Sequence, residues 1–254
     1  MKVAIVTGAS SGIGREISLL LDKEDSVEEI WLVARRAERL TALAEALTVK
    51  SRIFPLDVTS PDADETIAEA LRESDAEVTY AVLAAGAGVI GDLMKIPLEE
   101  QTAIIDLNCR SQVSFLYTLV PYMSKGSRVI GIASAAAFCP QPGFSVYAAT
   151  KSFYLSFLRG VRTELRPRGI SVTAVCPGPA KTEFFDVAEK HAKMSPLKRS
   201  FFTTPEKVAR VSLRAAKHNR AVATPTLVMK LFRILAKILP HGLLCAIMGG
   251  SEDV

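Results

Sequence analysis

Short apolar segments alternate along this chain with longer segments of helical periodicity, and this alternation limits the fold more than any other feature. Apolar runs of five or six residues suit strands buried on both faces, and the periodic segments suit helices that cover a parallel sheet. Right-handed connections place the loops that follow the strands along one edge. We therefore predict a doubly wound α/β fold of about seven parallel strands with helices on both faces, with strands near 2–7, 29–34, 52–56, 79–83, 127–133, 170–176 and 221–224 and helices at about 13–24, 37–47, 61–73, 98–122, 146–166 and 205–217.

The first predicted strand runs into a glycine-punctuated turn, Thr7-Gly-Ala-Ser-Ser-Gly-Ile-Gly14, which opens the first predicted helix. Glycines let the backbone approach a pyrophosphate, whose charge is favoured by the amino end of a helix. A glycine-rich turn elsewhere is often a plain loop, but its place between strand and helix favours a dinucleotide site. The residues predicted to bind the cofactor here are Gly8, Ser10, Ser11, Gly12, Ile13 and Gly14.

The end of the second predicted strand indicates which dinucleotide binds. An acidic residue usually accepts the ribose 2′-hydroxyl of NAD, whereas a 2′-phosphate calls for arginine. Ala34 stands where the acid is expected, and Arg35 and Arg36 follow it. Guanidinium groups match phosphate in geometry and charge, which favours NADP(H) over NAD(H). The alternative is that both arginines are merely solvated at the start of a helix.

Tyr147 and Lys151 are one helical turn apart, so their side chains can address the same bound molecule. A phenol with a pKa near 10 needs a neighbouring cation if it is to exchange protons near neutral pH, and Lys151 supplies one. Taken alone, the pair also fits an ordinary helix with a half-buried tyrosine and a solvated lysine. Ser134 changes the balance because it follows the strand-like run 129–133, at the edge where parallel sheets bind ligands. Its hydroxyl can donate to a carbonyl oxygen that the tyrosine protonates.

From Lys2 to about residue 225 the chain resembles the short-chain dehydrogenase/reductase (SDR) family. The order and spacing of several short motifs carry the resemblance: Thr7-Gly8-x-x-x-Gly12-x-Gly14, Asp57-Val58, Ala85-Gly86, Asn108, Ser134, Tyr147-x-x-x-Lys151 and Pro177-Gly178. The resemblance implies a single Rossmann-type catalytic domain over 1–225 and a nicotinamide cofactor. It also implies a catalytic tetrad of Asn108, Ser134, Tyr147 and Lys151.

The resemblance extends the predicted cofactor site to Asp57, Val58, Ala85, Gly86, Pro177, Gly178 and Thr182, with Tyr147 and Lys151 at its nicotinamide end. Asp57 would contact adenine, although it could equally cap a helix. Asn108 would fix a proton-relaying water, although in an apolar helix an asparagine can simply bond a backbone carbonyl and kink the helix. The fourth strand departs from the family, because Leu83-Ala84 replaces a frequent Asn-Asn pair, and the sheet must satisfy the polar groups by other means.

The substrate is expected to contact three loops, 87–95, 135–145 and 179–203, which are rich in phenylalanine and poor in acids. This favours a lipophilic carbonyl compound or alcohol, such as a steroid, a fatty acyl chain or a xenobiotic ketone. Half of the phenylalanines would, on the other hand, fit simple core packing. The segment after Thr182 is expected to close over the substrate. The predicted substrate contacts are Ser134, Phe138, Phe144, Tyr147, Phe184 and Phe185.

Composition excludes several other classes. The net charge of +4 comes without a concentrated basic patch carrying aromatic platforms, which argues against nucleic-acid binding. The four cysteines are far apart and do not cluster with the three histidines, so we predict no metal site. Because the sequence opens on a strand rather than a signal peptide, we expect a cytoplasmic protein with reduced thiols and no disulfide framework.

Residues 226–254 are predicted to form an apolar extension beyond the matched core. In a helix, Lys230, Arg233 and Lys237 would share one narrow stripe and leave a broad apolar face. The segment is too short and too charged to span a bilayer. We expect it to pack against the protein first, and to contact a membrane surface peripherally through 226–248 second, with an interface in a homodimer or homotetramer as the remaining role.

The leading prediction is an NADP(H)-dependent carbonyl reductase or alcohol dehydrogenase. The altered fourth strand keeps open a second class, a sensor or scaffold that binds NADP(H) without turnover. An epimerase or dehydratase on the same fold would usually show an altered tetrad, and this chain has all four residue types.

Overall fold

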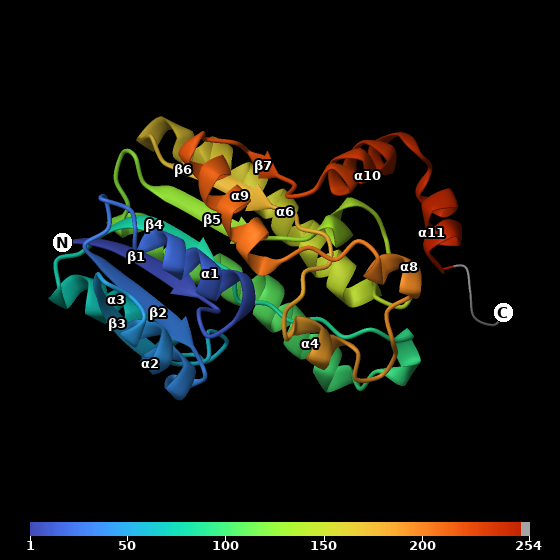
Figure 1. Cartoon of the computed structure of the whole chain (residues 1–254), viewed down its shortest axis with the longest axis horizontal. Helices are drawn as coiled ribbons and strands as arrows, with labels where there is room; N and C mark the ends of the chain where they lie inside the picture. Colours follow the sequence, from blue (N-terminus) through green and yellow to red (C-terminus); the bar gives the residue numbers. More distant parts are fainter. Residues whose placement is uncertain (250–254) are drawn as a thin grey trace.

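The computed structural model describes residues 1–249 and contains one seven-stranded parallel sheet of order β3-β2-β1-β4-β5-β6-β7. The order reverses between β1 and β4, which makes the sheet doubly wound (Figure 1). All seven predicted strands are present, with shifts of one or two residues at their ends. Their bounds are β1 Lys2–Thr7, β2 Glu29–Ala34, β3 Lys50–Pro55, β4 Glu77–Leu83, β5 Arg128–Ile132, β6 Ser171–Val175 and β7 Val222–Ala223.

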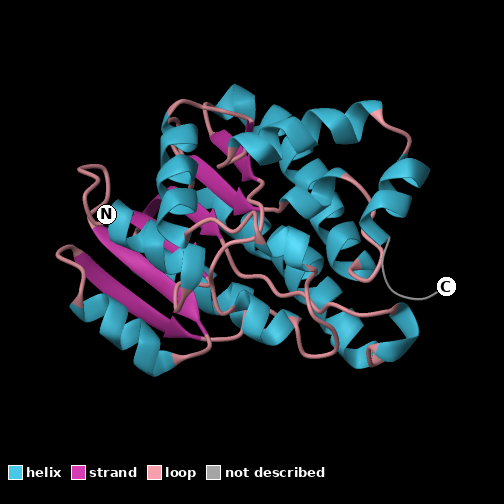
Figure 2. Ribbon diagram, turned by 45° about the vertical axis from the view of Figure 1, so that its right-hand side comes forward, coloured by secondary structure: helices cyan, strands magenta, loops and turns pink. Residues whose placement is uncertain are grey.

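Helices cover both faces of the sheet, as Figure 2 shows. One face packs against α3, α5 and α6, and the other packs against α1, α2 and α9. The α-helices are α1 Gly12–Leu21, α2 Ala37–Glu45, α3 Ala63–Glu73, α4 Leu98–Ile105, α5 Ser111–Leu119, α6 Ser145–Leu165, α7 Phe184–Ala188, α8 Pro196–Arg199, α9 Pro205–Lys217, α10 Leu227–Ile238 and α11 His241–Gly249.

Burial on both faces explains why the strands read as continuous apolar runs. In β1, Val3 and Ile5 belong to the cluster under α3, α5 and α6, whereas Ala4 and Val6 belong to the cluster under α1 and α9. Each large aliphatic side chain buried in this way contributes about 1.5–3 kcal/mol to folding. The two clusters pack both faces of the sheet, and its carboxyl edge positions the loops that carry the predicted site residues.

The predicted helix over 98–122 is interrupted. A π-helix, Asp106–Arg110, separates α4 from α5, and a 3₁₀ turn, Val120–Tyr122, ends the segment. One-turn π insertions of this kind commonly occur at functional sites. The insertion carries Asn108, a predicted tetrad member.

The C-terminal segment forms α10 and α11 at the end of the molecule opposite the N-terminus (Figure 1). Residues 250–254 of the predicted extension lie outside the described residues. Among the residues that the structure describes, no helix combines the length and apolarity needed to cross a bilayer.

Candidate active site

The glycine turn after β1 depends on glycine at each of its three positions. Gly8 and Gly12 adopt φ of 68° and 55°, which side chains disfavour. A Cβ atom on Gly14 would lie 2.4 Å from the Gly8 carbonyl oxygen, so α1 begins in direct contact with the turn. Ser11 is the N-cap of α1, and its side chain makes no capping bond. The amino end of α1 therefore offers backbone donors to an anion, as a pyrophosphate site requires.

Arg36 reaches the glycine turn, and Arg35 does not. One Arg36 nitrogen, Nη2, donates to Ser10 Oγ at 3.1 Å, while Nη1 pairs with Glu183 at 2.8 Å. Arg39, one turn further along at the start of α2, pairs with the other oxygen of Glu183. The sequence reasoning missed Arg39, although its spacing of three from Arg36 on a predicted helix was a usable signal.

Asp57 lies beside the same end of the sheet and caps a turn. Its Oδ1 accepts from the Thr59 amide at 2.9 Å and from the Thr59 hydroxyl at 2.7 Å, and its Oδ2 lies 3.7 Å from Arg35. Burial raises the pKa of Asp57, but the Thr59 hydrogen bonds and the Arg35 charge outweigh it and lower the pKa overall. The carboxylate is thus ionised and partly engaged. Val58 packs its side chain into the core.

Thr7 holds the backbone of the loop that follows β4. Its Oγ1 accepts hydrogen bonds from the amides of Ala84 at 3.1 Å and Ala85 at 3.2 Å. A Cβ on Gly8 would lie 2.8 Å from the Ala85 nitrogen, so the loops after β1 and β4 are in close contact. The Gln112 side chain donates to the Ala85 carbonyl at 3.1 Å. Leu83-Ala84 therefore leaves the cofactor edge hydrogen-bonded.

Asn108 is fully buried and ties the π-helix to the loop after β4. Its Oδ1 accepts from the Ala87 amide at 3.1 Å, and its Nδ2 donates to the Ala87 carbonyl at 2.8 Å and to Thr150 Oγ1 at 3.0 Å. The alternative expected from sequence, an asparagine bonded to a backbone carbonyl at a helix distortion, is thus present. The same contacts also bring Asn108 to the catalytic edge, since Thr150 immediately precedes Lys151.

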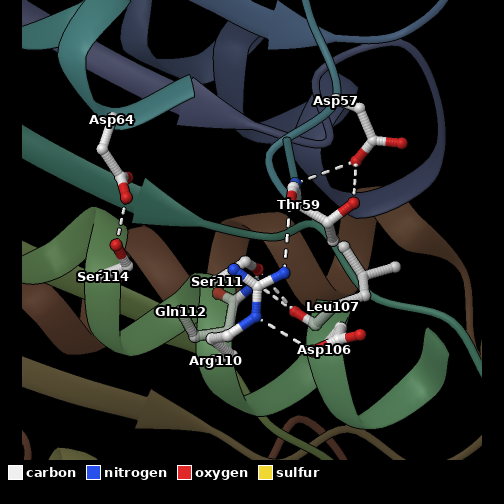
Figure 3. Close-up of polar contacts among 9 residues, drawn as sticks. All are labelled: Asp57, Thr59, Asp64, Asp106, Leu107, Arg110, Ser111, Gln112 and Ser114. Carbon is white, nitrogen blue, oxygen red and sulfur yellow. Dashed lines mark hydrogen bonds and ion pairs between the residues drawn. The ribbon is translucent and has the colours of Figure 1, made fainter. Parts of the chain in front are cut away.

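Side chains on the π-helix and α5 fix this distortion in place (Figure 3). Ser111 Oγ and Gln112 Nε2 donate to the Leu107 carbonyl at 2.7 and 3.0 Å. Arg110 donates to Asp106 at 2.9 Å and to the Thr59 carbonyl at 3.1 Å, and Ser114 bonds Asp64. The segment that carries Asn108 is therefore linked to the loop of Asp57.

Ser134, Tyr147 and Lys151 converge at the end of β5. Ser134 caps a 3₁₀ turn, Ala135–Phe138, by accepting from the Ala136 amide at 3.1 Å. The Ser134 side chain is near enough to the Tyr147 hydroxyl to lower its pKa. Lys151 donates its Nζ proton to the Ile132 carbonyl at 3.0 Å. A Cβ on Gly86 would lie 3.1 Å from Lys151 Nζ and 3.2 Å from Asn108 Oδ1, so the glycine makes room for both groups.

Burial dominates the electrostatics of this pair. Burial raises the pKa of Tyr147 to about 12, with the Ser134 side chain acting in the opposite direction, and burial lowers the pKa of Lys151 to about 8. The expectation that Lys151 depresses the Tyr147 pKa is not met in this structure. The reason is geometric, because Nζ is bonded to Ile132 and lies 5.7 Å from the centroid of the phenol ring.

Two of the four predicted substrate phenylalanines contact Tyr147. Phe144 stacks on its ring with centroids 4.2 Å apart, and Phe184 lies against it at 5.4 Å. Phe185 sits one step further away, against Phe184 and Phe202. Phe138 packs instead on Phe232 of α10, at 6.1 Å.

The loop after β6 covers the glycine turn and meets α10. The methyl group of Thr182 would lie 3.1 Å from a Cβ on Gly12. The Pro177 carbonyl accepts from the Ala135 amide at 2.8 Å. A Cβ on Gly178 would lie 2.9 Å from Met229 Sδ, so this glycine admits α10 against the site. Sequence reasoning did not assign Gly178 that packing role.

The model of the short chain dehydrogenase family matches residues 2–193. The chain belongs to this family. Its fold and the meeting of Asn108, Ser134, Tyr147 and Lys151 at one edge agree with that membership, and the protein is an oxidoreductase of the short-chain dehydrogenase/reductase family.

Relatives and solved structures support the family assignment. An uncharacterized oxidoreductase of Myxococcus xanthus is 34% identical over 190 residues, which cover 72% of this chain and 73% of the relative. A serine 3-dehydrogenase of Agrobacterium fabrum is 34% identical over 188 residues, covering 71% and 72%. A short-chain dehydrogenase from Sphingobium yanoikuyae in complex with NADPH has the same fold, with a TM-score of 0.78 at 24% identity and coverage of 100% and 98%.

The space beside the glycine turn suits the phosphate end of a dinucleotide, and the residues that line it do not include Ser134, Tyr147 or Lys151. A cavity of about 820 Å³ is lined by Ser10, Ser11 and Gly12 of the turn, Arg39 of α2, and Thr182 and Glu183 of the covering loop. Glycine at positions 8, 12 and 86 keeps backbone and side-chain donors accessible. Among the described residues, no group of three or more histidines, cysteines or acids is arranged to hold a metal ion, and the four cysteines are free thiols.

Proposed function

We propose that this protein is an NADP(H)-dependent oxidoreductase that interconverts a carbonyl and a secondary alcohol on a lipophilic substrate, with Tyr147 as the general acid/base. One observation carries the proposal. The Tyr147 hydroxyl lies beside the Ser134 side chain at the carboxyl edge of the sheet, and its ring packs against Phe144 and Phe184. Two adjacent hydroxyls in an apolar surround suit recognition of a carbonyl oxygen.

Each residue of the predicted tetrad would have a separate role in the reaction. When bound, NADPH supplies the hydride that reduces the carbonyl carbon. Tyr147 donates its phenolic proton to the carbonyl oxygen, and Ser134 donates a hydrogen bond to the same oxygen as charge develops there. Lys151 would hold the nicotinamide ribose, stabilise the phenolate that remains and return a proton to it. Asn108 would position the water through which Lys151 is reprotonated.

Support for NADP(H) over NAD(H) comes from Arg36 and Arg39. Both guanidinium groups lie beside the glycine turn and already hold a carboxylate, and β2 ends in Ala34 rather than an acid. Arginine pairs bind phosphate through several charge-assisted hydrogen bonds. Arg35 does not join this pair, and its guanidinium lies 3.7 Å from Asp57.

A direct test compares Tyr147→Phe with the wild type while screening lipophilic ketones and secondary alcohols with NADP(H) and NAD(H) in parallel. Loss of a general acid costs about 10²- to 10⁴-fold in turnover, so we expect kcat to fall by that range with NADPH affinity close to unchanged. Tyr117→Phe, at an exposed tyrosine on α5, is the matched control and should leave kcat unchanged.

A Tyr147→Phe enzyme with normal kcat would contradict the mechanism. A wild type that binds NADPH but turns over nothing in the screen would favour the sensor or scaffold alternative. Leu83-Ala84 first suggested that alternative, and the amides of Ala84 and Ala85 are hydrogen-bonded to the Thr7 hydroxyl.

The C-terminal extension of the domain, 226–254, is proposed to dock on an anionic membrane surface through α10 and α11, which would place the site near lipophilic substrates. Large apolar side chains of α10 face solvent, including Leu231, Ile234 and Ile238.

We also propose a homodimer or homotetramer in the cytoplasm. Support for self-association comes from exposed Leu98, Ile105, Tyr117 and Phe153 on neighbouring helices, and light scattering after gel filtration tests it.

A further inference from the structure

The two arginines beside the glycine turn hold a carboxylate of the protein itself. Glu183 bridges them, with Oε2 at 2.8 Å from Arg36 Nη1 and Oε1 bonded to Arg39 Nη1. Arg39 and then Arg36 hold the pKa of Glu183 below its ordinary value, so it is ionised at neutral pH. A carboxylate held by two guanidinium groups presents two oxygens to the donors that a phosphate would use.

Glu183 stands between two residues that contact the rest of the site. Thr182 rests on Gly12 of the glycine turn, and Phe184 packs against the ring of Tyr147. Three consecutive residues thus touch the cofactor turn, the arginine pair and the proposed general acid. A group that displaces Glu183 from the arginines therefore also shifts Thr182 and Phe184.

We propose that Glu183 competes with the 2′-phosphate of NADP(H) for Arg36 and Arg39, so that a phosphorylated dinucleotide frees the segment 182–184 and NAD(H) does not. The inference rests on the proposed function, since it requires NADP(H) to bind at this turn. A phosphate carries more negative charge than one carboxylate, and it has a third acceptor oxygen. It therefore displaces Glu183 from the two arginines. Glu183 is then a specificity-determining residue, because the 2′-phosphate of the cofactor must displace the Glu183 carboxylate from the arginines.

Calorimetry with 2′,5′-ADP tests the competition, because this probe carries the 2′-phosphate without the nicotinamide. If most of the free protein has Glu183 on the arginines, removing that charge raises the competent fraction, and Glu183→Gln should tighten 2′,5′-ADP by about three- to tenfold. Binding of 5′-AMP, which lacks the 2′-phosphate, should not change. The matched control is Asp186→Asn, an acid of α7 three residues after Glu183 that lines the same cavity and has no ion pair among the described residues.

Hydrogen exchange supplies a readout that does not depend on activity. In the wild type, 2′,5′-ADP should increase amide exchange over residues 182–189, whereas 5′-AMP should not, and Glu183→Gln should show the increase without ligand. Unchanged or weaker 2′,5′-ADP binding by Glu183→Gln overturns the inference, and weaker binding would show that Glu183 orients the arginines. In either case, a wild type that still prefers NADPH over NADH does not contradict the proposed function. A wild type that binds neither NADPH nor 2′,5′-ADP removes both.

Discussion

Lys151 is only 4% exposed, although it carries an amino group that water solvates strongly. Burial lowers the pKa of Lys151 from the ordinary lysine value of 10.5 to about 8, so at neutral pH the protein holds an ammonium group out of water. The difference corresponds to about 3 kcal/mol at most, because one pKa unit equals about 1.36 kcal/mol. Such a cost at a proposed catalytic position is an instance of stability given up for function.

Replacing Lys151 with methionine should therefore stabilise the protein, measured without added cofactor, by up to about 3 kcal/mol at pH 7 in urea unfolding, while abolishing turnover. Between pH 8 and 10.5 the unfolded chain binds more protons at this position than the folded one, so wild-type stability rises with pH there. The advantage of Lys151→Met should accordingly shrink as pH increases and vanish above the unfolded pKa. Lost contact with the Ile132 carbonyl reduces the gain.

The exposed Lys50 on β3 gives the control, since Lys50→Met should show no comparable pH-dependent gain. A Lys151→Met protein less stable than wild type at pH 7 would mean that the ammonium group stabilises the fold by its contacts. Its burial would then not be a cost of function.

Individual site residues could be predicted from the sequence where the residue types and their spacing together indicate one kind of chemistry. The tyrosine, lysine and serine fall into this class, and the structure brings them together as expected. Arg39 left only the signal of its spacing from Arg36, and Thr7 and Glu183 left none, because a threonine hydroxyl and a loop glutamate serve many purposes. Their roles depend on what folding places opposite them, which for Glu183 is a helix 144 residues earlier in the chain.

At the scale of elements, the alternation of apolar runs predicted all seven strands, since burial on both faces leaves a signal in every residue. The π-helix at Asp106–Arg110 left almost none, because one inserted residue barely changes the apolar periodicity of a long helix. The sole hint was Asn108 within that apolar pattern. The split of the C-terminal segment into α10 and α11 follows from Pro240, which cannot continue a helix.

The junction of β1, the glycine turn and α1 gives an element-scale prediction. Gly14→Ala would place a Cβ 2.4 Å from the Gly8 carbonyl oxygen, so α1 must move away from the turn. We expect a loss of roughly 1–3 kcal/mol of unfolding free energy, as overpacking typically costs, together with weaker NADPH binding. Thermal unfolding and a binding titration measure the two effects.

Gly160→Ala on α6 is the matched control, because the nearest atom to its Cβ would be a Glu164 carboxylate oxygen 4.0 Å away. Alanine in an open helix position should stabilise by about 0.5–1 kcal/mol. Both substitutions replace glycine with alanine, and their effects on the unfolding free energy are expected to have opposite signs. Equal effects would show that the turn tolerates a side chain at Gly14.

At the scale of the whole molecule, charge and apolar surface are unevenly distributed. From residue 207 to 251 the sequence contains eight lysines and arginines and no acid. Within α10, Met229 and Ala236 pack on the domain, whereas Leu227, Leu231 and Ile238 face away from it. A surface helix usually turns its apolar face inward, so this outward face calls for a partner.

An anionic lipid surface fits this region better than a second copy of it. Two copies joined through α10 would bring Lys230 and Lys237 together with no nearby carboxylate in this part of the sequence to offset them. Lipid headgroups supply the missing negative charge, and the acyl region accepts leucine and isoleucine side chains. The helix also contacts the loop of Phe138, which adjoins the active site, so docking would bring the site close to membrane-dissolved substrates.

Vesicle flotation tests this docking with the full-length protein. We expect binding to phosphatidylcholine vesicles containing 30% phosphatidylglycerol, a conventional anionic composition of roughly physiological charge, and little binding to phosphatidylcholine alone. Lys230→Gln with Lys237→Gln should weaken anionic binding by roughly thirtyfold, since each lysine near the surface contributes about 1 kcal/mol. Leu231→Glu with Ile238→Glu should abolish it, whereas Leu98→Glu on α4 should not. If the Leu231→Glu and Ile238→Glu variant instead breaks an oligomer seen without vesicles, the face is covered by a second copy, and membrane docking is wrong.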